Sequence, residues 1–69
     1  MDNWIDRVKE EKNELDIKIK KLTEFMQFAP KTDISNHMLY LLSEQLVTMN
    51  KYSYILGERI KEGENKKGE

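Results

Sequence analysis

The chain has 69 residues, 36% of them charged, and a formal net charge of −1. A chain this short buries a marginal core, so a disulfide, a metal or oligomerisation is expected to support it. It has no cysteine and a single histidine, His37. This composition excludes disulfides and thiolate metal sites, so we expect no metal and no cofactor, and we predict a homo-oligomer. The balanced charge and the short apolar runs argue against nucleic acid and membrane as partners.

A first helix is predicted over residues 3–28. Asp2 or Asn3 can cap its start, and neither glycine nor proline interrupts it before Pro30. Apolar residues recur at helical spacing and most other positions are charged, as in a helix that buries one stripe. The predicted stripe comprises Trp4, Val8, Leu15, Ile19, Leu22, Phe25 and Met26, with Ile5 at its edge.

Pro30 ends this helix, because the residue before a proline is pushed out of the helical region. The linker is short, which makes the two helices antiparallel neighbours. Asp33 or Ser35 can cap the second helix, which is predicted over residues 34–61. The polar tail, residues 62–69, is expected to be disordered or frayed. The predicted fold class is therefore all-α, an antiparallel two-helix hairpin.

The second helix carries two apolar stripes. The first consists of Leu39, Leu42, Leu46, Met49, Leu56 and Ile60. The second lies more than about 90° around the helix, at Tyr40, Val47 and Tyr54. One partner helix cannot cover both stripes, which predicts that hairpins assemble into a homo-oligomeric helical bundle. The predicted oligomer interface consists of Tyr40, Leu41, Val47, Tyr54 and Ile55.

A line of polar residues accompanies the predicted contact between the helices. A turn near residue 31 gives three facing pairs: Trp4 with Arg59, Glu11 with Tyr52, and Lys18 with Gln45. Buried charges are costly unless they are paired. The line therefore either pairs internally and fixes the register, or borders a cavity or protomer interface that holds a polar ligand. Gly57 is also open to two interpretations, a close approach of another backbone or ligand, or tolerated fraying.

Two sequence patterns resemble a known family. Residues 4–25 carry W-x-x-R-V-x-x-E-x-x-E-L-x-x-K-x-x-K-L-x-x-F, and residues 42–60 carry L-x-x-Q-L-x-x-M-x-x-Y-x-x-I-L-x-x-R-I. Together they resemble short helical-hairpin proteins of tailed bacteriophages, among them hypothetical proteins related to a crAss-like phage product. The chain departs from that family at Trp4, where tyrosine is commoner, and in its basic tail residues Lys66 and Lys67.

By size, architecture and origin, such proteins resemble the phage anti-CBASS and anti-Thoeris sponges, which hold cyclic nucleotides between protomers. The resemblance implies a non-catalytic sponge that sequesters a cyclic oligonucleotide or cyclic ADP-ribose derivative in the cytoplasm of the infected bacterial host. No enzyme is expected, because the sequence shows no nucleophile–base pair, metal set or glycine-rich phosphate loop. The alternative is a helical protein–protein interaction or structural module of a phage, with no small-molecule ligand.

A sponge for such a signal needs a ring that stacks on a base and donors that bind phosphates. One of two aromatic residues, Trp4 or Tyr52, would stack on a base, the three cations Arg7, Lys18 and Arg59 would hold phosphates, and one of two amides, Gln45 or Asn50, could read a base edge. More ordinary roles are also open, since Trp4 can close the end of a small core and Arg7 can belong to a solvated face. The candidate ligand-binding residues are Trp4, Arg7, Lys18, Gln45, Asn50, Tyr52 and Arg59.

Overall fold

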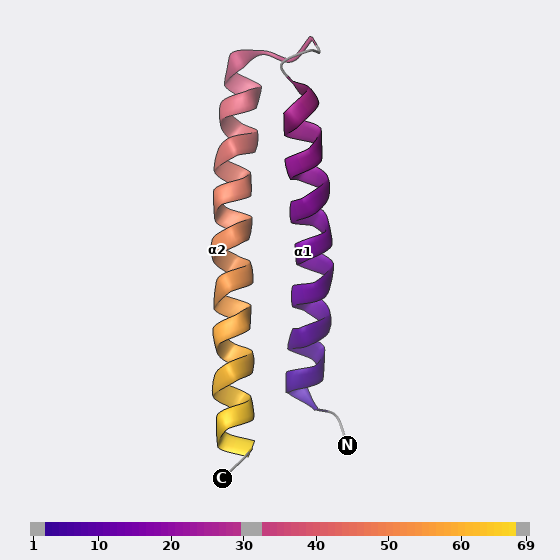
Figure 1. The fold of residues 1–69 in the computed structure, drawn as a ribbon. Coiled ribbons are helices and arrows are strands. Elements are labelled where there is room, and N and C mark those ends of the chain that lie inside the picture. Colours follow the sequence, from indigo (N-terminus) through magenta and orange to yellow (C-terminus); the bar gives the residue numbers. More distant parts are fainter. Residues whose placement is uncertain (1–2, 30–32, 68–69) are drawn as a thin grey trace.

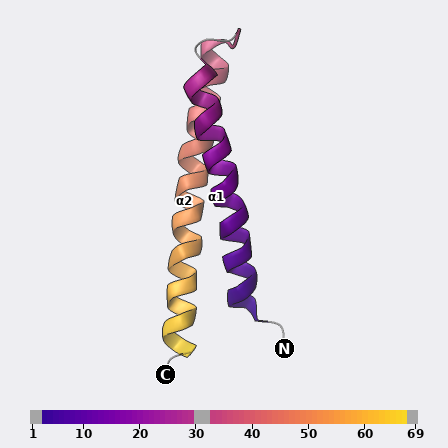
Figure 2. The same cartoon turned by 45° about the vertical axis from the view of Figure 1, so that its right-hand side comes forward.

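The computed structural model describes residues 3–29 and 33–67, which form two helices, α1 (Trp4–Phe28) and α2 (Asn36–Lys67). The helices run antiparallel and side by side in an elongated molecule of 53 × 17 × 15 Å (Figure 1). They are inclined to each other at a shallow angle (Figure 2). The predicted all-α hairpin is therefore confirmed, while its assembly into a homo-oligomer stays a prediction.

Side chains predicted as caps begin both helices. The side-chain oxygen of Asn3 accepts a hydrogen bond from the backbone N–H of Ile5 at 3.0 Å. The hydroxyl of Ser35 accepts one from the backbone N–H of Met38 at 3.1 Å. Both bonds satisfy backbone donors that have no partner within the first helical turn. The linker predicted at Pro30 lies outside the described residues.

Helix α2 continues to Lys67, six residues beyond the predicted end at residue 61. The frayed tail expected from residue 62 is thus helical as far as Lys67, and the last two residues lie outside the described part. Contacts with α1 explain the longer helix. Gly63 is buried against the start of α1, and Glu64 pairs with Lys9 at 2.8 Å.

Residues at alternating spacings of three and four form the contact between the helices, which we call the seam. Every seam residue is buried or half-buried. The seam contains Ile5, which is 7% exposed, and not Trp4, which is 45% exposed, the reverse of the expectation. On α1 and its C-terminal cap residue it comprises Ile5, Val8, Lys12, Leu15, Ile19, Leu22, Met26 and the cap, Ala29. On α2 it comprises Leu39, Leu42, Leu46, Met49, Ser53, Leu56, Ile60 and Gly63.

A polar layer interrupts the apolar seam near its middle. The ammonium of Lys12 binds the carboxylate of Asp16 at 2.8 Å, and this carboxylate also accepts a hydrogen bond from the buried Ser53 hydroxyl. The stem of Lys12 lies against Gly57, where an added Cβ would be 3.2 Å from Lys12 Cε. Gly57 therefore makes room for a side chain of α1, a use that neither interpretation from the sequence included.

The predicted oligomer interface lies on the outer face of α2 and is exposed in the single hairpin. It forms two strips about 100° apart, Tyr40, Val47 and Tyr54 on one and Leu41 and Ile55 on the other. The charged residues Glu44, Lys51 and Glu58 run between them. Over their described residues, neither α1 nor α2 contains an apolar stretch of the length that a membrane span requires.

Candidate functional site

The two edges of the seam carry different side chains. We call one the aromatic edge: Trp4, Glu11 and Lys18 of α1 with Gln45, Tyr52 and Arg59 of α2. We call the other the ionic edge: Lys9, Asp16 and Thr23 of α1 with Asn50, Gly57 and Glu64 of α2. Within each helix these residues are seven apart, so they lie on one side of it.

Six of the seven predicted ligand-binding residues lie at or beside the aromatic edge. Arg7 lies next to it on the outer side, about 60° around α1 from Trp4. Asn50 lies about 200° around α2 from Tyr52 and belongs to the ionic edge. The Asn50 amide donates to the backbone carbonyl of Leu46 at 3.0 Å. Within one hairpin, the structure does not bring Asn50 to the other candidates.

The ionic edge is tied across the helices. Lys9 pairs with Glu64 at 2.8 Å, and the hydrogen bond to Glu64 raises the pKa of Lys9. On the same edge, the hydrogen bond from Lys12, followed by that from Ser53, lowers the pKa of Asp16. These partners stabilise the charged forms and join α1 to α2 at two levels.

The middle of the aromatic edge pairs internally. The hydroxyl of Tyr52 donates a hydrogen bond to the carboxylate of Glu11, as the predicted register requires. This bond raises the pKa of Tyr52, because it holds the neutral phenol next to a carboxylate. Gln45 turns its amide towards the sulfur of Met49, at 3.8 Å, one turn along its own helix. The middle of the aromatic edge therefore helps to fix the register between α1 and α2.

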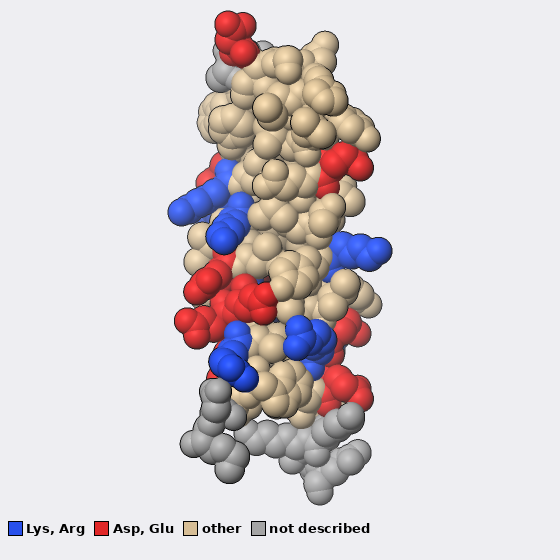
Figure 3. All heavy atoms as spheres, turned by 180° about the vertical axis from the view of Figure 1, so that it is seen from behind, with Lys and Arg blue, Asp and Glu red and all other residues tan. Residues whose placement is uncertain are grey.

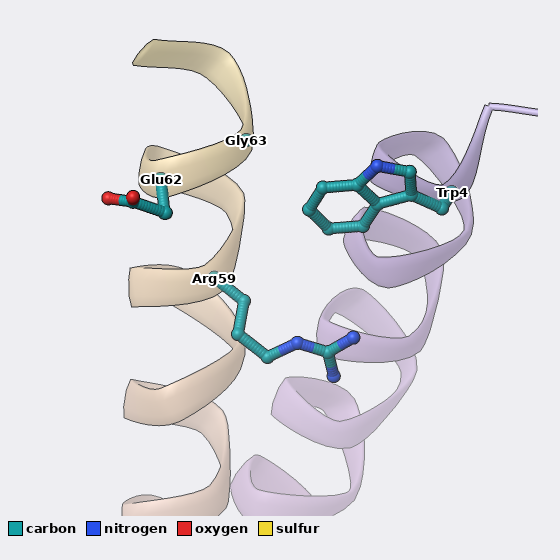
Figure 4. A pocket seen from close by; sticks show the side chains of 4 residues that line it. All are labelled: Trp4, Arg59, Glu62 and Gly63. Carbon is teal, nitrogen blue, oxygen red and sulfur yellow. The ribbon is translucent and has the colours of Figure 1, made fainter. Parts of the chain in front are cut away.

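The end of the aromatic edge that lies away from the turn, which we call its open end, forms a pocket of about 340 Å³. This pocket is lined by Trp4, Arg59, Glu62 and Gly63. The indole of Trp4 projects from α1 towards Gly63, and the guanidinium of Arg59 reaches across towards α1 (Figure 4). The carboxylate of Glu62 points away from α1 in the same view. The pocket thus places an aromatic ring from one helix beside a cation from the other, the pair predicted from the sequence.

The surface around this edge changes in character along the molecule. Seen from behind, Lys, Arg, Asp and Glu side chains concentrate away from the turn, while the end near the turn shows mostly other residues (Figure 3). Near the turn, Phe25, Phe28, Met38 and Leu41 are exposed. Charged groups therefore lie along the middle of the molecule and at the end that contains the pocket, whereas the end near the turn is largely uncharged.

The pocket has the parts of a site for a flat ring that carries an anion. An indole offers a stacking face, and a guanidinium can donate two hydrogen bonds to a phosphate. Within residues 3–29 and 33–67, no group of three or more His, Asp or Glu side chains could hold a metal ion. The sequence interpretation missed Glu62 and Gly63, which it assigned to the tail. The spacing that continues from Leu56 through Ile60 to Gly63 is the signal that could have found the glycine.

Comparison with known proteins assigns the chain to a family. No curated protein and no solved structure matches the chain. The protein-family model named Sequestin matches residues 2–62, which include α1, the turn and most of α2. The chain therefore belongs to the Sequestin family.

Proposed function

We propose that this protein is a phage-encoded, non-catalytic sponge that sequesters a cyclic-nucleotide-type immune signal. It would block CBASS or Thoeris defence in the cytoplasm of the infected bacterium. The family name is consistent with a sequestering role. The observation that carries the proposal is the pocket in which Trp4 of α1 and Arg59 of α2 come together.

Each candidate residue has a role in this proposal that follows from its position. Trp4 stacks on a base and Arg59 binds a phosphate, while Arg7 and Lys18 add positive charge beside the same edge. Tyr52 is held by Glu11, so it serves as a second platform only if that bond opens. Gln45 can read a base edge from the same side.

A second protomer would complete the site. The volume of about 340 Å³ is near the lower end of the range of roughly 300–1,000 Å³ for ligand pockets. A cyclic nucleotide with two phosphates needs more contacts than one ring and one guanidinium provide. In a homo-oligomer built through Tyr40, Val47 and Tyr54, with Leu41 and Ile55, a partner protomer supplies the remaining wall. Asn50, which faces away from its own pocket, would then be available to a neighbouring one.

Calorimetry with a panel of ligands tests the proposal. The panel contains a cyclic dinucleotide, a cyclic trinucleotide and cyclic ADP-ribose, and the wild type is expected to bind one of them with a Kd below about 10 μM. Arg59→Ala should weaken that binding about tenfold to a hundredfold, since it removes a charge-assisted hydrogen bond. Lys20→Ala is the control, because Lys20 is an exposed cation on the opposite side of α1.

Two outcomes contradict the proposal. If the wild type binds none of the panel, the sponge hypothesis fails. If the bound ligand is recovered chemically changed after heat release, the protein is not a simple sponge. If Arg59→Ala and Lys20→Ala bind like the wild type, a sponge remains but its site lies elsewhere.

A helical interaction module is the second candidate, and the exposed strips on the outer face of α2 favour it. Val47 and Tyr54 are 63% and 67% exposed. Large apolar side chains in rows on a small protein mark contact surfaces. This candidate predicts assembly without any ligand from the panel.

A further inference from the structure

We infer that Gly63 is a positioning residue for Trp4 and thereby sets the shape of the pocket. An added Cβ at Gly63 would lie 2.7 Å from Trp4 Cη2 and 2.8 Å from Trp4 Cζ2. It would also lie 3.0 Å from Ile5 Cδ1. These distances are below normal carbon–carbon contact, so the indole occupies the space that any other residue at position 63 would fill.

The indole meets α2 through its edge. Cζ2 and Cη2 belong to the six-membered ring, on the side away from the Trp4 backbone, and they contact the helix at Gly63. This arrangement supports the end of the ring on the α2 backbone and leaves its faces free of that contact (Figure 4). Trp4 remains 45% exposed although its tip touches α2. A ring held at its edge, with a face accessible, is suited to stack on a flat heteroaromatic group.

A comparison with Gly57 shows that the requirement for a residue without a Cβ is specific to position 63. Both glycines lie inside α2, where glycine is less favourable than alanine. An added Cβ at Gly57 would meet only Lys12 Cε, at 3.2 Å, near the end of a flexible side chain that can move aside. At Gly63 the neighbour is a rigid bicyclic ring. Gly57→Ala is therefore a matched control for Gly63→Ala.

Trp4 is the only tryptophan in the chain, so its fluorescence reports its position without any ligand. In Gly63→Ala the indole is expected to leave the α2 backbone, which shifts the emission maximum to longer wavelength and increases quenching by acrylamide. Gly57→Ala should keep the wild-type emission and quenching. Unchanged emission and quenching in a folded Gly63→Ala variant would overturn the inference.

Thermal unfolding followed by circular dichroism gives a second test that does not depend on tryptophan fluorescence. Gly63→Ala should lower the Tm in the wild-type background. In a Trp4→Phe background the loss should shrink or reverse, because phenylalanine lacks the two atoms nearest to the added Cβ. Gly57→Ala should change the Tm by the same amount in both backgrounds, because position 57 does not contact Trp4. An equal Tm loss for Gly63→Ala in both backgrounds would overturn the inference.

The consequence for binding rests on the proposed function and is measured separately. For whichever of a cyclic dinucleotide, a cyclic trinucleotide or cyclic ADP-ribose the wild type binds, Gly63→Ala should weaken binding about tenfold. Gly57→Ala should leave the Kd unchanged. If no probe binds the wild type, the proposed function fails, and the fluorescence and Tm results still decide whether Gly63 positions Trp4. If Gly63→Ala moves the indole but binds a probe as tightly as the wild type, Trp4 is not part of the site.

Discussion

The aromatic and ionic edges lie on either side of the same seam, yet their side chains differ in partners. On the ionic edge, Lys9 pairs with Glu64, and Asp16 binds Lys12 and Ser53. On the aromatic edge, Tyr52 binds Glu11, but the open end places Trp4 and Arg59 around a pocket. The same seven-residue spacing can therefore supply both stabilising contacts and a candidate binding surface. The comparison predicts that changes on the ionic edge affect folding, whereas changes at the open end of the aromatic edge affect binding.

Leu56→Ala should have the largest effect, because Leu56 supports both edges. Its side chain is fully buried in the seam. Truncation of a buried leucine costs about 2–5 kcal/mol, which is a large share of the stability of so small a domain. Chemical unfolding followed by circular dichroism measures the loss. Thr48→Ala, at an exposed position of α2, is the control, and a loss for Leu56→Ala no larger than the control's would contradict this view of the seam.

Val47→Glu should have the next largest effect, on assembly. Val47 lies on the outer strip beside the ionic edge and is 63% exposed in the single hairpin. If the strip is the oligomer interface, the change removes about 1.5–3 kcal/mol of apolar burial per protomer and places a charge in the contact. Light scattering should then show a smaller species, or circular dichroism an unfolded chain. A wild type that is a stably folded monomer at micromolar concentration would refute the predicted interface.

The hairpin and the pairing of Trp4 with Arg59 could be predicted from the sequence, because both depend on the spacing of residues along the helices. Seven-residue recurrence placed Glu11 beside Tyr52 and Trp4 beside Arg59, although the polar residues lie along an exposed edge and not within the seam. Spacing puts Gly63 in line with Leu56 and Ile60, but it could not show that a glycine there remains helical, because its support comes from Trp4 and Ile5 some sixty positions earlier. It also could not place Lys12 in the seam, since a charged residue there is favourable only with a partner such as Asp16.

Asp16→Asn should have a smaller effect that depends on pH. The hydrogen bonds from Lys12 and Ser53 lower the pKa of Asp16 in the folded chain. A lowered pKa adds stability above the unfolded value of about 3.9, and this stability is lost as the pH falls through the folded pKa. The wild type should therefore be more stable than Asp16→Asn at pH 6, with the difference shrinking below about pH 4. An equal difference at pH 6 and pH 3 would show that the charge of Asp16 does not contribute.

The smallest expected effect is on the titration of Tyr52. It tests whether the hydrogen bond between Tyr52 and Glu11, in the middle of the aromatic edge, persists in solution. The hydrogen bond to Glu11 raises the pKa of Tyr52, so the neutral phenol is favoured in the folded chain. The stability from this bond is present below the unfolded value of about 10 and is lost as the pH rises through the folded pKa. Subtracting the ultraviolet titration of Tyr52→Phe from that of the wild type isolates Tyr52, and its midpoint should lie above about 10. In Glu11→Gln the midpoint should fall, because the carboxylate that opposes ionisation is gone. If the midpoint is the same with and without the carboxylate, the bond does not persist in solution, and Tyr52 is free to act as a second stacking platform beside Trp4.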